Sequence, residues 1–203
     1  EGELAARGAR QVRVSDYASW YLAPGVDVEY EGLLALLEGA GYSKVGEAVN
    51  YEVDMADFHV PSRVVRIEER LRREGVSLRW AEGGEAGLLR WIGEAFSPFW
   101  RAEAEMALSA EGGGVLVAER GGSVVGFAVH GALRPDFFGP VGVDPRERGR
   151  GLGTVLLFRT LQRMREEGVR VATIPWTTHL AYYAQVPGVR WVRLFAVMAK
   201  SLA

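Results

Sequence analysis

A loop rich in arginine and glycine, residues 144–151, has the residue types and spacing that most clearly suggest chemistry. It follows an expected strand at 137–143 and precedes a segment whose apolar period predicts a helix up to 167. Such a loop directs successive backbone N–H groups toward one point, at the positive end of a helix dipole. Glycine lets the backbone approach phosphates closely, and arginine adds positive charge. The sequence therefore predicts an anion site here, most simply for the phosphates of a cofactor.

Two common phosphate-binding patterns do not fit this loop. The Walker A pattern requires a lysine, and the chain has only Lys44 and Lys200, both far from the loop. The dinucleotide pattern G-x-G-x-x-G would fall on Gly149, Gly151 and Thr154, and the last of these is not glycine. A parallel strand with an acidic end is also not expected about 20 residues later. A nucleotide-binding protein of either class is therefore not indicated.

A third pattern, R-x-x-G-x-G/A, is met by Arg148, Gly151 and Gly153. It resembles motif A of the GNAT acyltransferases, the superfamily of acetyl-CoA-dependent N-acetyltransferases. The resemblance implies transfer of an acetyl group from acetyl-CoA to a primary amine, by direct attack in a ternary complex. The acceptor would be a small-molecule or peptidic amine. The alternative is a non-catalytic module that binds acyl-CoA or serves as a scaffold.

The elements expected around the loop occur in the GNAT order. Strands are expected at 76–80, 115–119, 123–130, 137–143, 169–174 and 191–198, and helices at 85–96, about 99–108, up to 167 and 180–185. Arg120-Gly121-Gly122 predicts a tight hairpin turn between two of these strands. The fold class implied is α/β (α+β), with a mixed, mostly antiparallel central sheet splayed between its fourth and fifth strands and flanked by helices.

The first sixty residues repeat part of this order. Residues 7–14 parallel 167–171, and residues 41–45 parallel 188–192, with a helix expected at 30–37 and a bent strand or hairpin at 42–55. We expect a partial GNAT-like domain at 1–60, equivalent to a C-terminal half, then a helical linker at 61–75 and a complete GNAT domain at 76–203. The chain would then be part of a longer tandem protein. The alternative is an N-terminal α/β extension unrelated to the repeat.

The resemblance also implies which residues hold acetyl-CoA. Backbone groups of a strand segment would pair with the pantetheine arm, and the loop would surround the pyrophosphate, mainly through N–H groups. The strand residues are Val141, Gly142 and Val143, and the loop residues are Arg148, Gly149, Arg150, Gly151, Leu152, Gly153 and Thr154. Gly142 is expected at a β-bulge that opens the sheet for the thioester.

By resemblance, a tyrosine on the short helix after the fifth strand protonates the departing thiolate. Tyr183 is the choice and Tyr182 the alternative. A phenol pKa of about 10 is close enough to that of a thiol for this transfer. Val189 stands where the family usually has an aromatic residue, and the spacing from Tyr183 to Gly188 is one residue longer than usual.

The sequence does not identify the general base or the acceptor. Asp136, Glu94, Glu103 and His130 are candidates for the base, and so is a chain of water molecules. Trp176 follows the fifth strand, where it would line an acceptor pocket or belong to the core. An aromatic group at 91–100 could equally form a pocket wall or core between two helices.

Composition excludes several classes. A net charge of −2 gives no broad attraction to nucleic acid, and no apolar run approaches the length of a membrane span. The absence of cysteine excludes disulfides, thiolate metal sites and an acyl-cysteine intermediate, and the three histidines lack metal-ligand spacing. We therefore expect no metal and a cytoplasmic location, and we leave a homodimer open.

Overall fold

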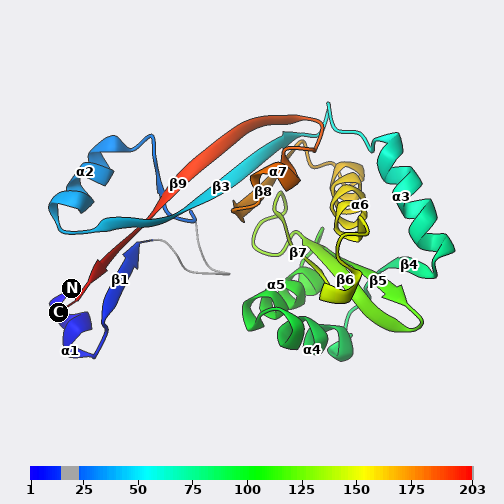
Figure 1. The fold of residues 1–203 in the computed structure, drawn as a ribbon, viewed down its shortest axis with the longest axis horizontal. Helices are drawn as coiled ribbons and strands as arrows, with labels where there is room; N and C mark the ends of the chain where they lie inside the picture. The colour runs from blue at the N-terminus through cyan, green and yellow to red at the C-terminus, as the bar shows by residue number, and fades with distance from the viewer. Residues whose placement is uncertain (15–22, 203) are drawn as a thin grey trace. The chain divides into compact units, whose positions relative to one another are not determined.

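The computed structural model describes residues 1–14 and 23–202, which pack as two compact units (Figure 1). Unit 1 consists of Glu1–Tyr51, Pro175–Ala184 and Trp191–Ala203, and unit 2 of Glu52–Ile174 and Gln185–Arg190. The chain passes between them four times, three of these within a strand, so neither unit is a continuous segment of sequence.

Unit 2 is built on an antiparallel sheet of four strands in the order β4-β5-β6-β7. Their bounds are Val76–Trp80, Gly114–Arg120, Ser123–His130 and Phe138–Val143. The hairpin between β5 and β6 turns at Gly121 and Gly122, with φ of 56° and 77°, as the sequence predicts. These strands are nearly continuous runs of apolar residues because both faces of the sheet are covered by helices.

The alternation of side chains assigns each strand residue to one of these two faces. Val115, Val117, Phe127 and Val129 face helices α4 (Ala86–Ala95) and α5 (Pro98–Ser109) and form one core with them. The opposite face is covered by α6 (Leu152–Glu166), as Figure 1 shows. There a Cβ added to Gly126 would lie 3.0 Å from a methyl carbon of Leu156, so α6 packs directly on the backbone of β6.

Helix α3 (Ser62–Arg73) packs against α6 and β4 through an apolar stripe that includes Val64 and Leu71. Across the two helices, Arg159 Nε donates to Glu68 Oε2 at 2.8 Å. The sequence places α3 far from α6, and it is this packing that brings the C-terminal end of α3 to the arginine-rich loop.

The other sheet has the strand order β1-β9-β3-β8, with the short β2 paired to β9. The bounds are Gln11–Val14 for β1, Val26–Asp27 for β2, Ser43–Asp54 for β3, Val171–Thr177 for β8 and Val189–Ser201 for β9. Three short helices accompany these strands: α1 (Gly2–Ala6), α2 (Glu31–Gly39) and α7 (Leu180–Tyr183). Residues 43–54 form one continuous strand, so the hairpin alternative for this segment is wrong.

The splayed sheet expected from the sequence is confirmed within unit 2. β7 pairs with β6 along one edge, and among the described residues the strand contact with β8 is a parallel bridge between Phe137, just before β7, and Thr173. The other edge of β7 has no partner strand in the described part of the chain. No helix among the described residues is both long and apolar enough to cross a membrane.

Shortening a buried side chain of α6 should destabilise unit 2. Leu156 is fully buried under β6, so Leu156→Ala should lower the free energy of unfolding by about 2–5 kcal/mol through lost transfer energy and a residual cavity. The matched control, Val65→Ala on exposed α3 surface, should change it by less than about 0.5 kcal/mol. Urea unfolding measures the free energy of unfolding of both variants, and equal losses in Leu156→Ala and Val65→Ala would contradict this packing.

Candidate active site

The strand segment at 141–143 lies at the open edge of β7, and its backbone groups alternate in direction. The Asp144 N–H donates to the Val125 carbonyl at 2.9 Å, which makes that pair and the Gly142–Phe127 pair the hydrogen-bonded ones. The N–H and C=O groups of Val141 and Val143 therefore point away from β6. Two of the three expected strand residues present backbone groups at this edge, while those of Gly142 are directed toward β6.

Gly142 does not lie at a β-bulge, which corrects the expectation from the sequence. Its pairing with Phe127 is regular, and the register shift of β7 falls between Val141 and Phe138, at Gly139-Pro140. Proline has no N–H to donate, so the regular ladder is interrupted there.

Position 142 requires glycine because neighbouring rings leave no space for a side chain. A Cβ at this position would lie 2.6 Å from a ring carbon of Phe127 and 2.8 Å from one of Phe96. Phe96 stacks on Trp100, with ring centroids 5.5 Å apart, and meets Trp91 edge to face. Trp91, Phe96 and Trp100 therefore pack against the core of α4 and α5, with Phe96 next to Gly142, whereas Phe99 is exposed.

The loop that follows turns through two glycines and ends at the first residue of α6. Asp144 caps a short 3₁₀ turn, Pro145–Glu147, by accepting the Arg146 N–H at 2.9 Å. Gly149 has a φ of 75°, and Gly151, the N-cap of α6, has a φ of 83°. Both angles lie in the left-handed region that favours glycine.

The start of α6 presents unsatisfied donors. The first backbone hydrogen bond of the helix runs from the Val155 N–H to the Gly151 carbonyl at 3.1 Å. The N–H groups of Leu152, Gly153 and Thr154 precede it and have no partner one turn earlier within the helix. The side chain of Leu152 is buried, so this residue offers the loop its backbone alone.

The arginines of the loop differ in how they are paired. Arg150 forms an ion pair with Glu74 at the end of α3 and another with Glu147, 3.4 Å away. Arg148 donates from Nε to the Val143 carbonyl at 3.1 Å, and in the described part of the chain it has no acidic partner. Of these two arginines, Arg148 is thus the one whose charge is not neutralised by a carboxylate.

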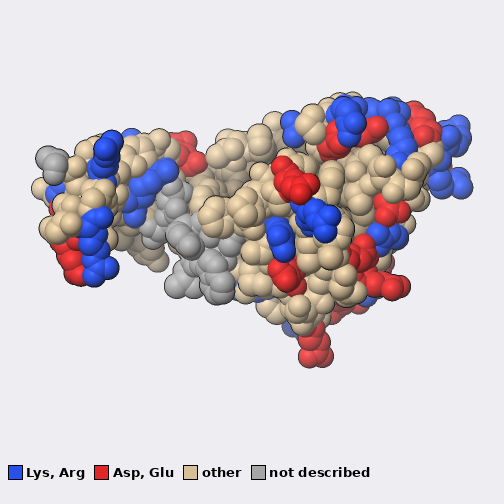
Figure 2. All heavy atoms as spheres, turned by 90° about the horizontal axis from the view of Figure 1, so that it is seen from below, with Lys and Arg blue, Asp and Glu red and all other residues tan. Residues whose placement is uncertain are grey.

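Ion pairing also sets the protonation of Asp144. Its carboxylate accepts the Arg146 guanidinium at 2.8 and 3.0 Å, and these hydrogen bonds lower the pKa of Asp144 to about 2. Figure 2 shows basic and acidic side chains interspersed on the face that it draws.

Tyr182 and Tyr183 lie on α7 in unit 1, whereas the loop belongs to unit 2. The two rings are 4.7 Å apart, and Tyr183 also packs on Tyr51 of β3 at 6.1 Å. Burial raises the pKa of Tyr183 to about 12 and raises that of Tyr182 further. Both phenols therefore keep their proton at neutral pH, as an acid must.

Sequence reasoning missed the residues of β3 that support this helix. The Tyr51 hydroxyl donates to the Leu180 carbonyl at 2.9 Å, and Asn50 Oδ1 accepts the Trp176 N–H at 2.8 Å. Trp176 has a φ of 46°, unusual for a residue with a side chain and a mark of local strain that often accompanies function. The contacts join segments 126 or more residues apart, so no local pattern could reveal them.

The candidate bases occupy different environments. His130 is buried at the end of β6, 3.7 Å from a Glu167 oxygen, and burial lowers its pKa. Asp136 pairs with Arg134 and contacts the Thr173 hydroxyl. Glu94 is exposed, and Glu103 is half-buried on α5. His130 lies opposite Phe138, at the other end of β7 from the loop.

Comparisons with known proteins agree with this geometry. Residues 68–184, more than half of the chain, match the acetyltransferase (GNAT) family model. The chain belongs to this family.

Two curated relatives match shorter segments. A Nocardia farcinica L-2,4-diaminobutyric acid acetyltransferase is 45% identical over 62 residues, which cover 28% of this chain and 32% of the relative. A Thermomonospora curvata mycothiol acetyltransferase is 37% identical over 113 residues, which cover 47% of this chain and 37% of the relative. These matches span only about a third of each relative's length.

Solved structures share the fold at low sequence identity. The glucosamine N-acetyltransferase region of a fungal multi-domain β-N-acetylglucosaminidase superposes with a TM-score of 0.79 at 19% identity, covering 97% of this chain and 26% of that one. A tandem GNAT protein from the clavulanic acid biosynthesis pathway superposes with a TM-score of 0.61 at 15% identity, covering 98% of this chain and 66% of that one.

The Asp144–Arg146 pair should contribute to stability in a pH-dependent way. Since the native pKa is lowered to about 2, the contribution is fully present above the unfolded-state pKa of about 3.9 and is lost as pH falls toward 2. In urea unfolding, Asp144→Asn should therefore be less stable than the parent at pH 6, and the difference should shrink as pH falls from 4 to 2. A difference independent of pH would contradict the ion pair.

Proposed function

We propose that this chain is an acetyl-CoA-dependent N-acetyltransferase that acetylates a primary amine by direct attack in a ternary complex. The observation that carries the proposal is a pair of backbone surfaces in unit 2: the β7 edge at Val141 and Val143, which has no partner strand in the described part of the chain, and the first turn of α6. They meet through one short loop, as an extended arm ending in a diphosphate requires. At the β7 edge the Val143 carbonyl accepts from Arg148 Nε, which a pantetheine donor would have to displace. The thioester of acetyl-CoA would supply the activated acyl group.

In this proposal the protein acts mainly by positioning. Val141 and Val143 hold the pantetheine arm as though it were an added strand, while Gly142 leaves room for the aromatic rings behind it. The N–H groups of the loop and of the α6 first turn bind the pyrophosphate, and Arg148 adds its charge. Arg150 takes a supporting role, because Glu74 and Glu147 already neutralise it.

We assign the general acid to Tyr183, which protonates the departing thiolate. Its support is its place on α7 and its packing on Tyr51. The raised pKa keeps the phenol protonated but also makes it a weaker proton donor than a free tyrosine. Tyr182 is the alternative. Since the two tyrosines and the loop belong to different units, the pairing of Tyr183 with the thioester rests on family resemblance.

We also infer a tandem organisation, with a partial GNAT-like half at 1–60, a helical linker at 61–75 and the complete domain at 76–203. The support is the strand order β1-β9-β3-β8, in which the strands after α1 and α6 are the two outer ones. Both helices also end in the same way, a common ending that α2 shares at Gly41. After α1, the Gly8 N–H donates to Ala5 and the Ala9 N–H to Leu4; after α6, the Gly168 and Val169 N–H groups make the same pattern, all at 2.9–3.0 Å. The φ angles of Gly8 and Gly168 also match, at 84° and 89°.

The activity is tested by release of free thiol from acetyl-CoA across a panel of amines. The panel includes 2,4-diaminobutyrate, glucosamine, polyamines, other amino acids and peptides. Amine-dependent release identifies the acceptor class. Tight acetyl-CoA binding with no release for any amine would instead support the non-catalytic module.

Reversing charge in the loop should abolish cofactor binding. Position 149 has open space around its Cβ but a φ of 75°, so Gly149→Asp combined with Arg148→Glu adds negative charge together with some backbone strain. Gly149→Asn, which adds the same strain without the charge, is the matched control for that strain. The loss of the Arg148 charge and the repulsion by two added carboxylates should weaken acetyl-CoA binding by at least about a hundredfold in calorimetry. The control Arg90→Glu, on the exposed side of α4, should bind normally. Unchanged affinity in the double variant would remove the cofactor assignment.

Tyr183→Phe should lower kcat by about 10²–10⁴-fold with little change in acetyl-CoA affinity, because the ring remains and only the proton donor is lost. Steady-state kinetics and calorimetry measure the two quantities. Tyr182→Phe is the matched control on the same helix. If Tyr182→Phe loses turnover and Tyr183→Phe does not, the acid role moves to Tyr182.

A further inference from the structure

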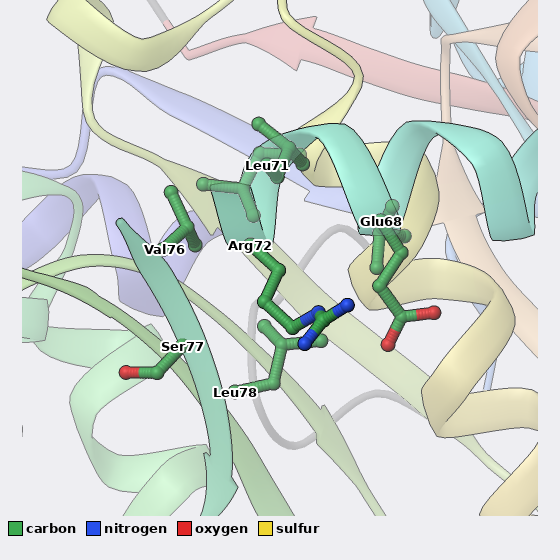
Figure 3. Close-up of a pocket in the computed structure, with 8 residues that line it drawn as sticks. Glu68, Leu71, Arg72, Val76, Ser77 and Leu78 are labelled. Atoms are coloured by element: carbon green, nitrogen blue, oxygen red, sulfur yellow. The ribbon is translucent and has the colours of Figure 1, made fainter. Parts of the chain in front are cut away.

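A pocket of about 290 Å³ lies between α3, β4 and α6 (Figure 3). It is lined by Glu68, Leu71, Arg72, Val76, Ser77, Leu78, Leu152 and Val155. Five of these eight residues are aliphatic, so the pocket is mostly apolar. An apolar cavity of about 150 Å³ can hold benzene, so this one has room for a ligand of on the order of ten non-hydrogen atoms.

The charges at the pocket favour an anion. The Glu68 carboxylate is engaged by Arg159, which donates to it from two nitrogen atoms. The exposed Arg72 side chain makes no hydrogen bond or ion pair with any residue that the structure describes. Figure 3 shows it reaching from α3 toward Leu78 on β4. A free guanidinium beside aliphatic walls suits a carboxylate, which it can bind through two parallel N–H groups.

The neighbouring strand adds further donors. β4 is an edge strand, and the Ala81 N–H donates to the Val115 carbonyl at 2.8 Å, which fixes the alternation of bonds along it. The N–H groups of Val76 and Leu78 therefore point away from β5. A polar head group near Arg72 can accept from this edge while an apolar tail occupies the pocket.

We propose that this pocket binds a small carboxylate with a short aliphatic chain. The chain packs between the leucine and valine side chains of α3, β4 and α6, and the carboxylate pairs with Arg72. The site differs from the proposed acetyl-CoA site, which uses the β7 edge and the amide groups of the loop.

Occupancy of the pocket should be coupled to cofactor binding, a step that rests on the proposed function. Leu152 and Val155 line the pocket and belong to the first turn of α6, whose N–H groups are assigned to the pyrophosphate. The same end of α3 is fixed to the loop, since Arg70 donates to the Arg150 carbonyl at 2.5 Å. A ligand that shifts α3 against α6 therefore changes the phosphate site, and by linkage the cofactor changes the ligand's affinity equally.

Binding is tested on the free protein with sodium octanoate in calorimetry, with octan-1-ol as the neutral comparison. We expect octanoate to bind at least about tenfold more tightly than octanol, in line with one charge-assisted contact. Arg72→Gln should remove that preference. Arg73→Gln, an exposed arginine of the same helix that does not line the pocket, should retain it.

A second variant tests the apolar part of the site. Leu78→Trp places a larger side chain at a half-buried pocket wall and should abolish octanoate binding while circular dichroism stays unchanged. If octanoate does not bind the parent protein, or binds Arg72→Gln as tightly as the parent, the proposal is wrong.

Coupling is tested by repeating the octanoate titration with saturating coenzyme A. A change in octanoate affinity of about threefold or more, matched by an equal change in coenzyme A affinity, is expected. Equal affinities with and without coenzyme A would overturn the coupling. If coenzyme A fails to bind while octanoate binds through Arg72, the proposed function fails and the carboxylate site stands.

Discussion

The candidate site depends on backbone groups that the fold leaves without a protein partner. An N–H or C=O group buried without a hydrogen bond is costly, so such groups remain exposed or await a ligand. Here they occur at the start of α6 and along the β7 edge at Val141, because in the described part of the chain β8 bonds to Asp136 and Phe137, just before β7, and not to β7 itself. Both depend on the splay of β7 from β8, because a continuous ladder would have consumed the strand groups and closed the approach to the helix.

Carboxylates determine which loop cations remain available to an anion. Glu74 approaches Arg150 and also lies 3.7 Å from Arg120, which itself bonds Glu147 at 2.8 Å. The hydrogen bond from Arg150 also lowers the pKa of Glu74, so this carboxylate stays charged. The cluster holds α3, the β5–β6 hairpin and the loop together. It leaves anion binding mainly to main-chain donors, whose direction is set by the fold.

The fold and the loop were largely predictable from the sequence because their signals are local. Glycines at 121, 122 and 151 do adopt positive φ angles, and the strand and helix order around them is confirmed. The prediction of a bulge at Gly142 was wrong, because a glycine in a strand can indicate either irregular pairing or a close neighbour. Here the neighbours are Phe96 and Phe127, and only tertiary packing distinguishes the two cases.

The contribution of α3 was not predictable, because Ile67, Glu68 and Glu74 read as parts of a charged linker. Their partners on α6 and the loop lie 76 or more residues away. Ile67 shows the consequence most directly: a Cβ at Gly151 would lie 2.7 Å from one of its methyl carbons. The glycine at the N-cap of α6 is therefore required by helix packing as well as by its φ of 83°.

The strand order β1-β9-β3-β8 argues that the N-terminal segment is integral to the fold. β1 and β8 follow the two matching helix endings, and β3 and β9 follow Gly41 and Gly188, whose φ angles of 88° and 91° also match. In the tandem organisation that we propose, this order is symmetric about its centre, with each repeat contributing one outer and one inner strand. An appended extension would add at an edge, whereas β3 lies between two strands of the second repeat. Through β3, Tyr51 reaches Tyr183, so the first repeat helps to shape the setting of the candidate acid.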